Sequence, residues 1–241
     1  MAVRPRSPSD AVNGTVRLVG SVPDAFAVLV AEEMVVSTDG CRLFLSGGGT
    51  AEACYQALAA RSGIDWTGVD IYLGDERCVP LDDPDSNHRM IAATLLHPVG
   101  PVRSDNPMYV DGPPADAASA YQDLVAPLPD LGLVHLGLGP DGHTASLFTG
   151  SGALRVTDPG RSVVANRDPN GVNPHERITL TYAGIARARR VVFTVSGASK
   201  RDAFTRIAAG QDLPAARVDG GEVLWLVDAD ALGRGTPDEV G

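Results

Sequence analysis

The sequence predicts an α/β fold, and two observations carry this prediction. Short apolar runs rich in β-branched residues alternate with helix-like segments along most of the 241 residues. The apolar runs show little polar alternation, which is typical of strands buried on both faces of a parallel sheet. We therefore expect a single Rossmann-like domain over residues 1–241, with a mostly parallel sheet and helices on both faces. No linker separates two complete sets of strands and helices, and residues 1–14 are expected to form a flexible N-terminal extension.

Six runs have the composition of strands: Val16–Val19, Leu43–Leu45, Val69–Leu73, Leu133–Leu138, Val191–Val195 and Val223–Val227. Five segments have the length and apolar spacing of helices: 24–36, 50–61, 86–96, 115–125 and 199–209. Residues 177–183 (RITLTYA) alternate more cleanly and predict an edge or antiparallel strand. The stretch 149–174 is rich in Gly, Pro and Asn, so we expect a loop excursion or a hinge there.

Composition narrows the classes of function. The net charge of −10 argues against a nucleic-acid surface, which needs a clustered basic face. Three cysteines without CxxC or CxxH spacing predict neither a disulfide framework nor a zinc site, and they favour a reducing compartment. No apolar run approaches the ~20 residues needed to span a bilayer. Residues 1–10 are polar and Pro-rich, unlike an export signal, so we expect a cytoplasmic protein.

Ligands of open α/β sheets bind beyond the carboxyl ends of the strands. One such end is LFLSGGGT, residues 43–50, where a strand, three glycines and a helix start follow one another. Gly47, Gly48 and Gly49 let backbone N–H groups approach an anion, and the helix N-terminus adds positive potential. Ser46 and Thr50 add hydroxyls. The segment matches neither Walker A nor GxGxxG, so phosphate binding and a plain tight turn both remain open.

Charged residues follow other predicted strands. Asp75, Glu76 and Arg77 come directly after an apolar run, in YLGDER. An arginine there can stabilise negative charge on a substrate oxygen or bind a phosphate, although a solvated loop is the alternative. Arg177 opens the RITLT run and Lys200 closes SGASK. Each alone is typical of a surface charge, but together with the glycine segment they predict a phosphate clamp.

A histidine stands at a third strand end, in LGLGPDGHTASLF, residues 136–148. An imidazole ordinarily titrates near neutral pH, so His143 is a candidate to take a proton from water. Asp141 either orients that ring or shapes the Asp-Gly turn, and the sequence leaves both open. The other four histidines lack this setting. Among them His135 lies inside a predicted strand and is expected to be a packed or hydrogen-bonded core residue.

Five motifs occur together, in order and at characteristic spacings: LSGGGT, GDER followed by Ser86-Asn87, GLGPDGHTASLF, RITLT and SGASK. Over about residues 15–230 the chain closely resembles bacterial 6-phosphogluconolactonases and the related glucosamine-6-phosphate deaminases. The resemblance implies their fold and hydrolysis of 6-phospho-D-glucono-1,5-lactone to 6-phosphogluconate in the oxidative pentose phosphate pathway. It also implies a small-molecule sugar-phosphate lactone as partner, no metal or organic cofactor, and no nucleic acid or membrane. We expect a monomer.

The resemblance also implies roles for residues in the matching motifs. His143 is the expected general base, Asp141 its neighbour, and Arg77 the group that assists at the lactone oxyanion. The phosphate is expected on Gly47, Gly48, Gly49, Thr50, Arg177 and Lys200. The residues expected to line the rest of the site are Ser46, Asp75, Glu76, Asn87 and Gly142. Without a GxSxG elbow or an identifiable base near Ser46, a serine nucleophile is the less favoured route.

Two alternatives keep the scaffold and change the function. A sugar-phosphate isomerase or deaminase needs proton transfer at a sugar carbon, and the related deaminases carry an acidic residue in DGHxAFNE. Here the corresponding stretch is SLFTG, without a carboxylate, which favours hydrolysis. A non-catalytic sugar-phosphate sensor is the second alternative. Such sensors usually carry a helix-turn-helix, which the short polar segment before the first strand does not predict.

Overall fold

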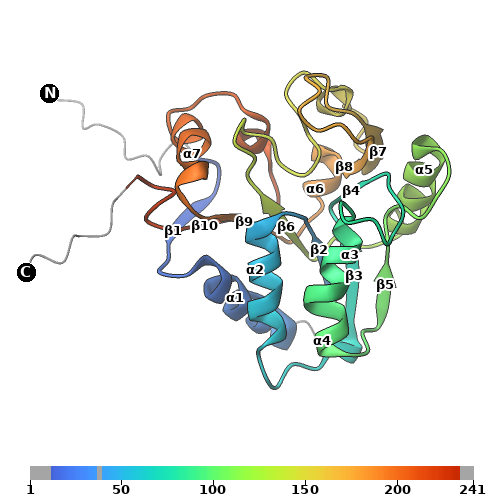
Figure 1. Ribbon diagram of the computed structural model, residues 1–241, viewed down its shortest axis with the longest axis vertical. Helices are drawn as coiled ribbons and strands as arrows, with labels where there is room; N and C mark the ends of the chain where they lie inside the picture. The colour runs from blue at the N-terminus through green and yellow to red at the C-terminus, as the bar shows by residue number, and fades with distance from the viewer. Residues whose placement is uncertain (1–11, 37–39, 234–241) are drawn as a thin grey trace, which may run out of the picture.

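A seven-stranded parallel sheet forms the centre of the computed structural model, which describes residues 12–36 and 40–233. The strand order is β1-β10-β9-β6-β2-β3-β5 (Figure 1). Six strands confirm the predicted runs: β1 (Thr15–Leu18), β2 (Cys41–Leu45), β3 (Val69–Leu73), β6 (Leu133–Gly137), β9 (Arg190–Val195) and β10 (Val223–Val227). The edge strand β5 (Ser104–Asn106) was not predicted, because its three residues are all polar.

The order of the strands reverses between β2 and β6. From β2 the chain moves outward to β3 and β5, then returns to β6 and continues in the opposite direction to β9 and β10. β2 and β6 are neighbours, with Leu43 paired to Leu133 and Phe44 to Val134. In such sheets the crevice beyond the carboxyl ends at the reversal is the expected ligand site. The glycine segment, residues 47–50, leaves the sheet near the end of β2. The histidine segment, which carries His143, leaves it at the end of β6.

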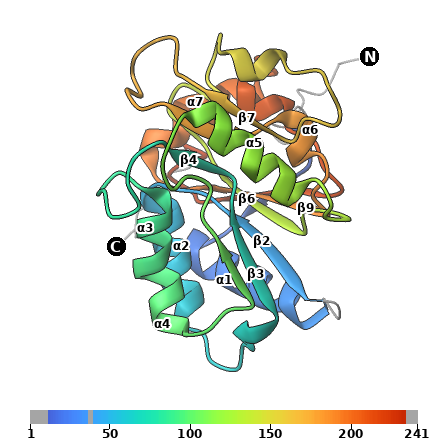
Figure 2. The same ribbon diagram turned by 90° about the vertical axis from the view of Figure 1, so that its right-hand side faces the viewer.

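Helices cover both faces of the sheet, as predicted (Figure 2). On one side lie α1 (Val22–Val36), α2 (Gly49–Ala59) and α3 (Asn87–Ile91), which continues through a π-helical turn (Ala92–Leu96) into α4 (His97–Val99). On the other side lie α5 (Pro114–Val125) and α6 (Tyr182–Ile185), while α7 (Arg201–Ala208) follows β9. No described helix is long and apolar enough to cross a membrane.

A small antiparallel sheet, β4 (Asp75–Arg77), β8 (Arg177–Leu180) and β7 (Val163–Asn166), packs beside α5. The RITLTYA run is therefore an antiparallel strand, as predicted, but it is the buried central strand rather than an edge. It stops at Leu180 because Thr181 caps α6 with its side-chain oxygen. The excursion 149–174 contains β7, so this stretch is only partly loop.

The N-terminal extension predicted for residues 1–14 lies largely outside the described residues, which begin at Val12. From Val12 onward the prediction is wrong, because the chain is already packed. Val12 is buried, and the Trp225 indole N–H donates to the Asn13 carbonyl at 2.9 Å. The Asn13 side-chain amide in turn donates to the Val218 carbonyl at 2.8 Å. These contacts attach the segment before β1 to the core around β10.

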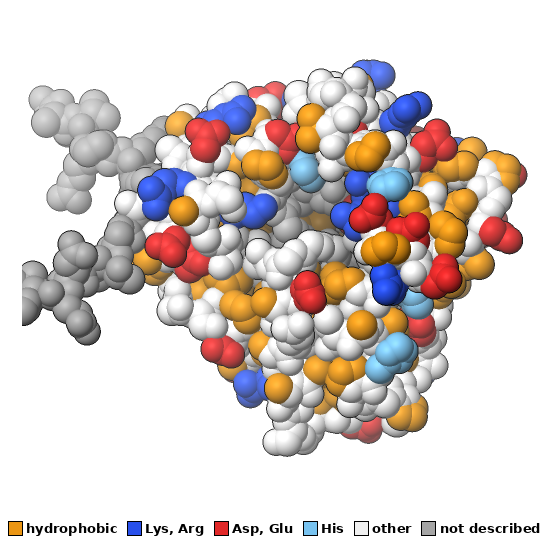
Figure 3. All heavy atoms as spheres, in the orientation of Figure 1, with side chains coloured by type: hydrophobic (Ala, Val, Ile, Leu, Met, Phe, Trp, Pro, Cys, Tyr) orange, Lys and Arg blue, Asp and Glu red, His pale blue; other side chains and the backbone are white. Residues whose placement is uncertain are grey.

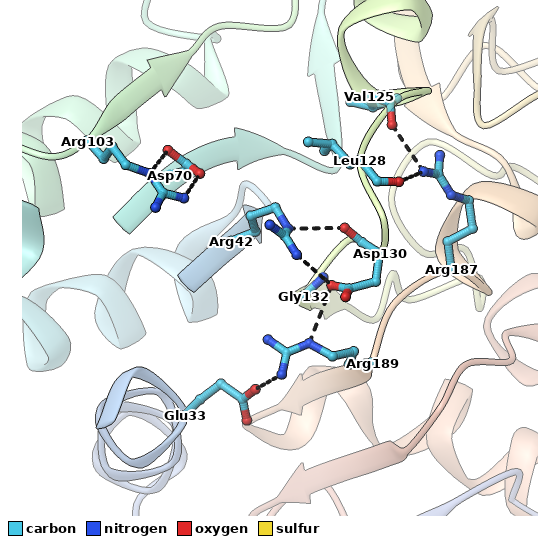
Figure 4. Close-up of polar contacts among 10 residues, drawn as sticks. All are labelled: Glu33, Arg42, Asp70, Arg103, Val125, Leu128, Asp130, Gly132, Arg187 and Arg189. Atoms are coloured by element: carbon cyan, nitrogen blue, oxygen red, sulfur yellow. Dashed lines mark hydrogen bonds and ion pairs between the residues drawn. The ribbon is translucent and has the colours of Figure 1, made fainter. Parts of the chain in front are cut away.

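At the amino ends of the strands the charged side chains pair with one another (Figure 4). Asp130, just before β6, accepts from Arg42 at 3.1 Å and from Arg189 at 3.3 Å. Arg189 also reaches the buried Glu33 of α1 at 3.4 Å, and Arg103 pairs with Asp70. Each arginine drawn at this edge therefore has an acceptor, and its charge is used in holding strands and helices together.

Candidate active site

The carboxyl ends of the strands surround one cleft at the reversal between β2 and β6. Seen from the face in Figure 3, the molecule is hollowed near its middle, with basic side chains and a histidine gathered on the rim. The cleft is lined by most of the predicted site residues: Ser46, Gly47, Gly48, Gly49, Thr50, Asp75, Arg77, Asn87, His143, Arg177 and Lys200.

The glycine segment joins β2 to α2. The helix begins at Gly49, and Gly48 before it has φ 98° and no side chain to cap the helix. The first N–H groups of α2 therefore remain available to an anion at this end of the cleft. Gly47 cannot be larger, because a Cβ there would lie 1.8 Å from the Asn87 side-chain oxygen. Asn87 also donates from its amide nitrogen to the Asp75 carbonyl at 2.9 Å, so it ties the start of α3 to the start of β4.

His143 lies in a tight turn after β6. The Gly139 N–H donates to the His143 carbonyl at 2.8 Å, and the imidazole covers Gly139 so closely that a Cβ would lie 2.2 Å from Nδ1. His143 Nδ1 lies 2.5 Å from Asp141 Oδ1. This hydrogen bond lowers the pKa of Asp141 to about 2. When the ring donates its Nδ1 hydrogen to Asp141, Nε2 is the nitrogen that can accept a proton.

Asp141 serves both of the roles that the sequence left open. Its Oδ1 accepts from the backbone N–H of His143 at 3.2 Å, which shapes the turn, and from the ring, which orients the imidazole. Asp141 itself stands behind the histidine and does not line the cleft. The ring of Phe148 lies 5.1 Å from the imidazole, centre to centre, and packs against it.

Two arginines stand directly opposite each other beside the cleft. Arg77 on β4 pairs in register with Arg177 on β8. Like charges at facing positions of a sheet are destabilising. Arg77 donates to the Asp85 carbonyl at 2.5 Å, whereas no described residue accepts a hydrogen bond from the Arg177 guanidinium. Arg177 is only 5% exposed. Burial lowers its pKa, Asp75 opposes the shift, and the charge of Arg77 adds to it.

Lys200 reaches the cleft from the turn after β9. The carboxylate of Asp228 fixes this turn by accepting from the Ser196 hydroxyl at 2.6 Å and from the Gly197 N–H at 2.9 Å. Lys200 forms no ion pair with any residue of the described ranges. Burial lowers its pKa, while the nearby Asp141 acts in the opposite direction. Unlike the arginines at the amino edge, Arg77, Arg177 and Lys200 form no ion pair with a carboxylate in the described part of the chain.

Two residues predicted to line the site lie behind it instead. The buried Glu76 accepts backbone N–H groups of Arg77, Asn87 and His88, each at 2.7 Å, and the Ser86 hydroxyl at 3.1 Å. Burial raises the pKa of this carboxyl, and the three backbone donors oppose the shift. Glu76 therefore fastens the start of α3. Gly142, at φ 89°, is packed against Leu213, so it serves the turn.

Asp75, beside Glu76 in the chain, does face the cleft. It is 6% exposed and accepts from the Ser146 hydroxyl at 2.7 Å. The preceding residue, Ala145, also lines the cleft and has φ 46°, the one left-handed non-glycine backbone among the described residues. Such a conformation costs roughly 1–2 kcal/mol. The turn after His143 is thus held in a strained shape that directs Ser146 to Asp75.

Sequence reasoning missed several lining residues, among them Thr194 and Asn173. Thr194 is the polar residue near the end of the apolar strand β9, and that position was the available signal. Asn173 comes from the excursion before β8, where no periodic pattern distinguishes one polar residue from another. Within residues 12–36 and 40–233, no three His, Cys, Asp or Glu side chains gather as ligands for a metal ion.

His135 is a hydrogen-bonded core residue, as predicted. Its Nδ1 lies 2.8 Å from the Tyr55 hydroxyl and its Nε2 lies 2.8 Å from the Thr194 hydroxyl. Burial lowers its pKa to about 3. The Ser46 hydroxyl donates to the His135 carbonyl at 2.7 Å. That proton is engaged with a carbonyl rather than a base, which agrees with the low expectation for a serine nucleophile.

Comparison with known proteins adds an independent finding. A family model described as glucosamine-6-phosphate isomerases/6-phosphogluconolactonase matches residues 20–225. A 6-phosphogluconolactonase of Synechocystis is 38% identical over 203 residues, covering 78% of this chain and 81% of the relative. One of Mycobacterium tuberculosis is 36% identical over 236 residues, covering 90% and 91%.

Solved structures show the same relationship. The crystal structure of a 6-phosphogluconolactonase from Thermotoga maritima matches with a TM-score of 0.75 and 30% identity, over 88% of this chain and 97% of that chain. A monomeric glucosamine-6-phosphate deaminase matches with a TM-score of 0.73 at 20% identity, over 91% of this chain and 98% of that one. At that identity the second likeness concerns the fold alone.

Proposed function

Because the chain belongs to the glucosamine-6-phosphate isomerase/6-phosphogluconolactonase family, we propose that it hydrolyses 6-phospho-D-glucono-1,5-lactone to 6-phosphogluconate, a step of the oxidative pentose phosphate pathway. One observation carries the proposal beyond the relatives. An oriented imidazole stands in the same cleft as a buried guanidinium that has no acceptor among the described residues. A base and an unmatched cation are what an anionic ester substrate requires.

The phosphate is assigned to the N-terminus of α2, Arg177 and Lys200. The uncapped first turn of α2 supplies backbone donors and positive potential. Arg177 supplies a fork of N–H donors suited to phosphate oxygens, and Lys200 adds a second charge. Anchoring the distant phosphate lets its binding energy orient the lactone carbonyl against the attacking water.

Water is the nucleophile in the proposed reaction. His143 Nε2 takes a proton from water as the water oxygen bonds to the lactone carbonyl carbon. Arg77 stabilises the oxyanion that forms. The bond from this carbon to the ring oxygen then breaks, and the ring oxygen receives the proton from His143. A positioned base contributes about 10²–10⁴-fold, and an oxyanion donor about 10²–10³-fold. The charge of Asp141 stabilises the imidazolium between the two proton transfers.

Deamination or isomerisation has less support. The related deaminases carry an acidic residue just after the histidine segment, where this chain reads SLFTG without a carboxylate. Among the described residues that line the cleft, Asp75 is the one carboxylate, and it is engaged by Ser146. A sugar-phosphate sensor without catalytic activity would not need an imidazole that a carboxylate orients, as Asp141 orients His143.

The test is acid release from freshly prepared phosphogluconolactone, corrected for spontaneous hydrolysis, with ammonia release from glucosamine 6-phosphate measured in parallel. We expect acid release alone, and we expect His143→Gln to reduce kcat at least about 100-fold with a small change in KM. The matched control is His97→Gln, because His97 is exposed on α4 and does not line the cleft. Lactone hydrolysis no faster than in buffer, or ammonia release, overturns the proposal. Activity of His143→Gln within a few-fold of the parent overturns the assignment of the base.

A further inference from the structure

A buried polar cluster lies directly behind the glycine segment. It joins Tyr55 of α2, His135 of β6, Thr194 of β9 and Ser46, and each of these residues is at most 3% exposed. His135 bonds to Tyr55 and Thr194 through its two ring nitrogens, both at 2.8 Å. The Tyr55 hydroxyl accepts from the Ser46 N–H at 2.8 Å and lies 3.0 Å from the Ser46 carbonyl oxygen.

The cluster connects three adjacent strands to the cleft. β6 stands between β2 and β9 in the sheet, and His135 bridges from it to both sides. Ser46 and Thr194, at the two ends of the cluster, both line the cleft. Ser46 is also the residue from which the glycine segment departs. The backbone of Ser46 is held on both its N–H and its carbonyl by one tyrosine hydroxyl, and that hydroxyl is held by His135.

Stability alone does not require these polar groups. The imidazole ring packs on Phe26 with ring centres 4.2 Å apart, a contact that a leucine also makes. Replacing buried hydrogen-bonding partners by apolar groups of the same shape is often nearly neutral for stability, whereas a satisfied buried network fixes one geometry. The cluster therefore fixes the position of the Ser46 backbone, and with it the start of the glycine segment that follows Ser46.

The proton count selects one tautomer. The Tyr55 hydroxyl has a single hydrogen and already accepts from the Ser46 N–H. If His135 carries its proton on Nδ1, the imidazole donates to Tyr55 and the Tyr55 hydrogen is free for the Ser46 carbonyl. The Thr194 hydroxyl then donates to Nε2. In this arrangement every member is satisfied, whereas the other tautomer takes the Tyr55 hydrogen away from Ser46.

We propose that His135, anchored by Thr194, is a positioning residue that acts through Tyr55 to hold the glycine segment in its phosphate-binding shape. This inference rests on the proposed function, in which residues 47–50 hold the phosphate. Burial keeps His135 neutral, with its pKa lowered to about 3, so the network is unchanged across the physiological range. The reacting groups lie elsewhere, His143 in the turn after β6 and Arg77 on β4, and their side-chain hydrogen bonds go to Asp141 and Asp85 rather than to the cluster.

The test is the split between KM and kcat in two variants. His135→Leu removes the central hydrogen bonds and keeps an apolar side chain against Phe26, while Tyr55→Phe removes one oxygen. We expect each to raise KM for the phosphorylated lactone roughly tenfold, the factor that corresponds to losing one hydrogen bond from binding. We expect kcat to stay within about threefold, and KM for unphosphorylated gluconolactone to stay unchanged. The dissociation constant of 6-phosphogluconate, measured by calorimetry, should rise with KM.

The matched control is Leu133→Ala, because Leu133 is fully buried and begins the same strand, at the end away from the cleft. It should lower the melting temperature through lost packing and leave KM unchanged. Variants that melt at a lower temperature but bind 6-phosphogluconate like the parent overturn the inference, as does a fall in kcat at constant KM. If His135→Leu does not fold, Tyr55→Phe decides the question. A parent without lactonase activity refutes the proposed function, while the 6-phosphogluconate measurement still tests His135.

Discussion

The neutral state of His135 has a measurable consequence for stability against acid. Its pKa is lowered from 6.5 to about 3 by burial in the folded protein. Below pH 6.5 the unfolded chain therefore binds a proton that the folded protein does not bind. Stability from this group is complete above its unfolded pKa and is lost as the pH falls toward the folded pKa. The slope is about 1.4 kcal/mol per pH unit, so roughly 2–3 kcal/mol is lost between pH 6.5 and about 4.5.

Comparison with His135→Leu isolates this contribution, because all carboxylates titrate alike in the two proteins. Urea unfolding followed by tryptophan fluorescence is suitable, since Trp66 and Trp225 are both buried. At about pH 7.5 we expect the variant to be less stable by about 1–2 kcal/mol, from the hydrogen bonds it loses. By about pH 4.5 the difference should vanish or reverse. A difference that stays constant over this range refutes the argument that His135 is buried and neutral.

Three further outcomes follow from charges in the structure. Arg177→Gln should raise KM at least about tenfold, because it removes a proposed phosphate ligand. It should also raise the melting temperature of the ligand-free protein, because it removes a buried charge without an acceptor. A lower melting temperature would contradict the second expectation. Glu76→Gln should lower the free energy of unfolding by roughly 2–3 kcal/mol in urea, because an amide NH₂ then faces backbone N–H donors. A loss below about 0.5 kcal/mol would show that the carboxylate does not hold α3. Asp130→Asn should lower the free energy of unfolding by only about 0.5–1 kcal/mol and weaken its salt dependence, because the ion pairs of Asp130 are partly exposed. It should leave KM unchanged, since Asp130 lies at the amino edge of the sheet. A change in KM would contradict the separation of the amino edge from the cleft.

The strands and motifs could be predicted because each rests on a local pattern. Apolar runs of three to six residues marked every long strand of the main sheet. The carboxyl-end rule then placed the glycine segment, His143 and Lys200 at one edge without knowledge of the coordinates. The same reasoning failed for β5, whose Ser-Asp-Asn sequence pairs with β3 only because the neighbouring strand offers it an edge.

The roles of neighbouring acidic residues could not be predicted, because they depend on tertiary register. Asp75 and Glu76 are adjacent in a strand, so their side chains point to opposite faces. Only the antiparallel pairing of β4 with β8 determines that Asp75 faces the cleft and Glu76 the start of α3. The same pairing sets Arg77 opposite Arg177, which lie a hundred positions apart in the chain. No local pattern contains that information.

The reversal of strand order between β2 and β6 also governs when activity can arise during refolding. The groups of the cleft span Ser46 to Lys200 and come from strands that meet only when the sheet is complete. Long-range contacts of this kind form slowly during folding. The proposed base, His143, and the proposed phosphate ligands, Arg177 and Lys200, are too far apart in the sequence to be brought together by local structure alone. Recovery of lactone hydrolysis after dilution from denaturant should thus trail the return of helical circular dichroism. 6-Phosphogluconate added during renaturation should therefore bind only those chains that have completed folding.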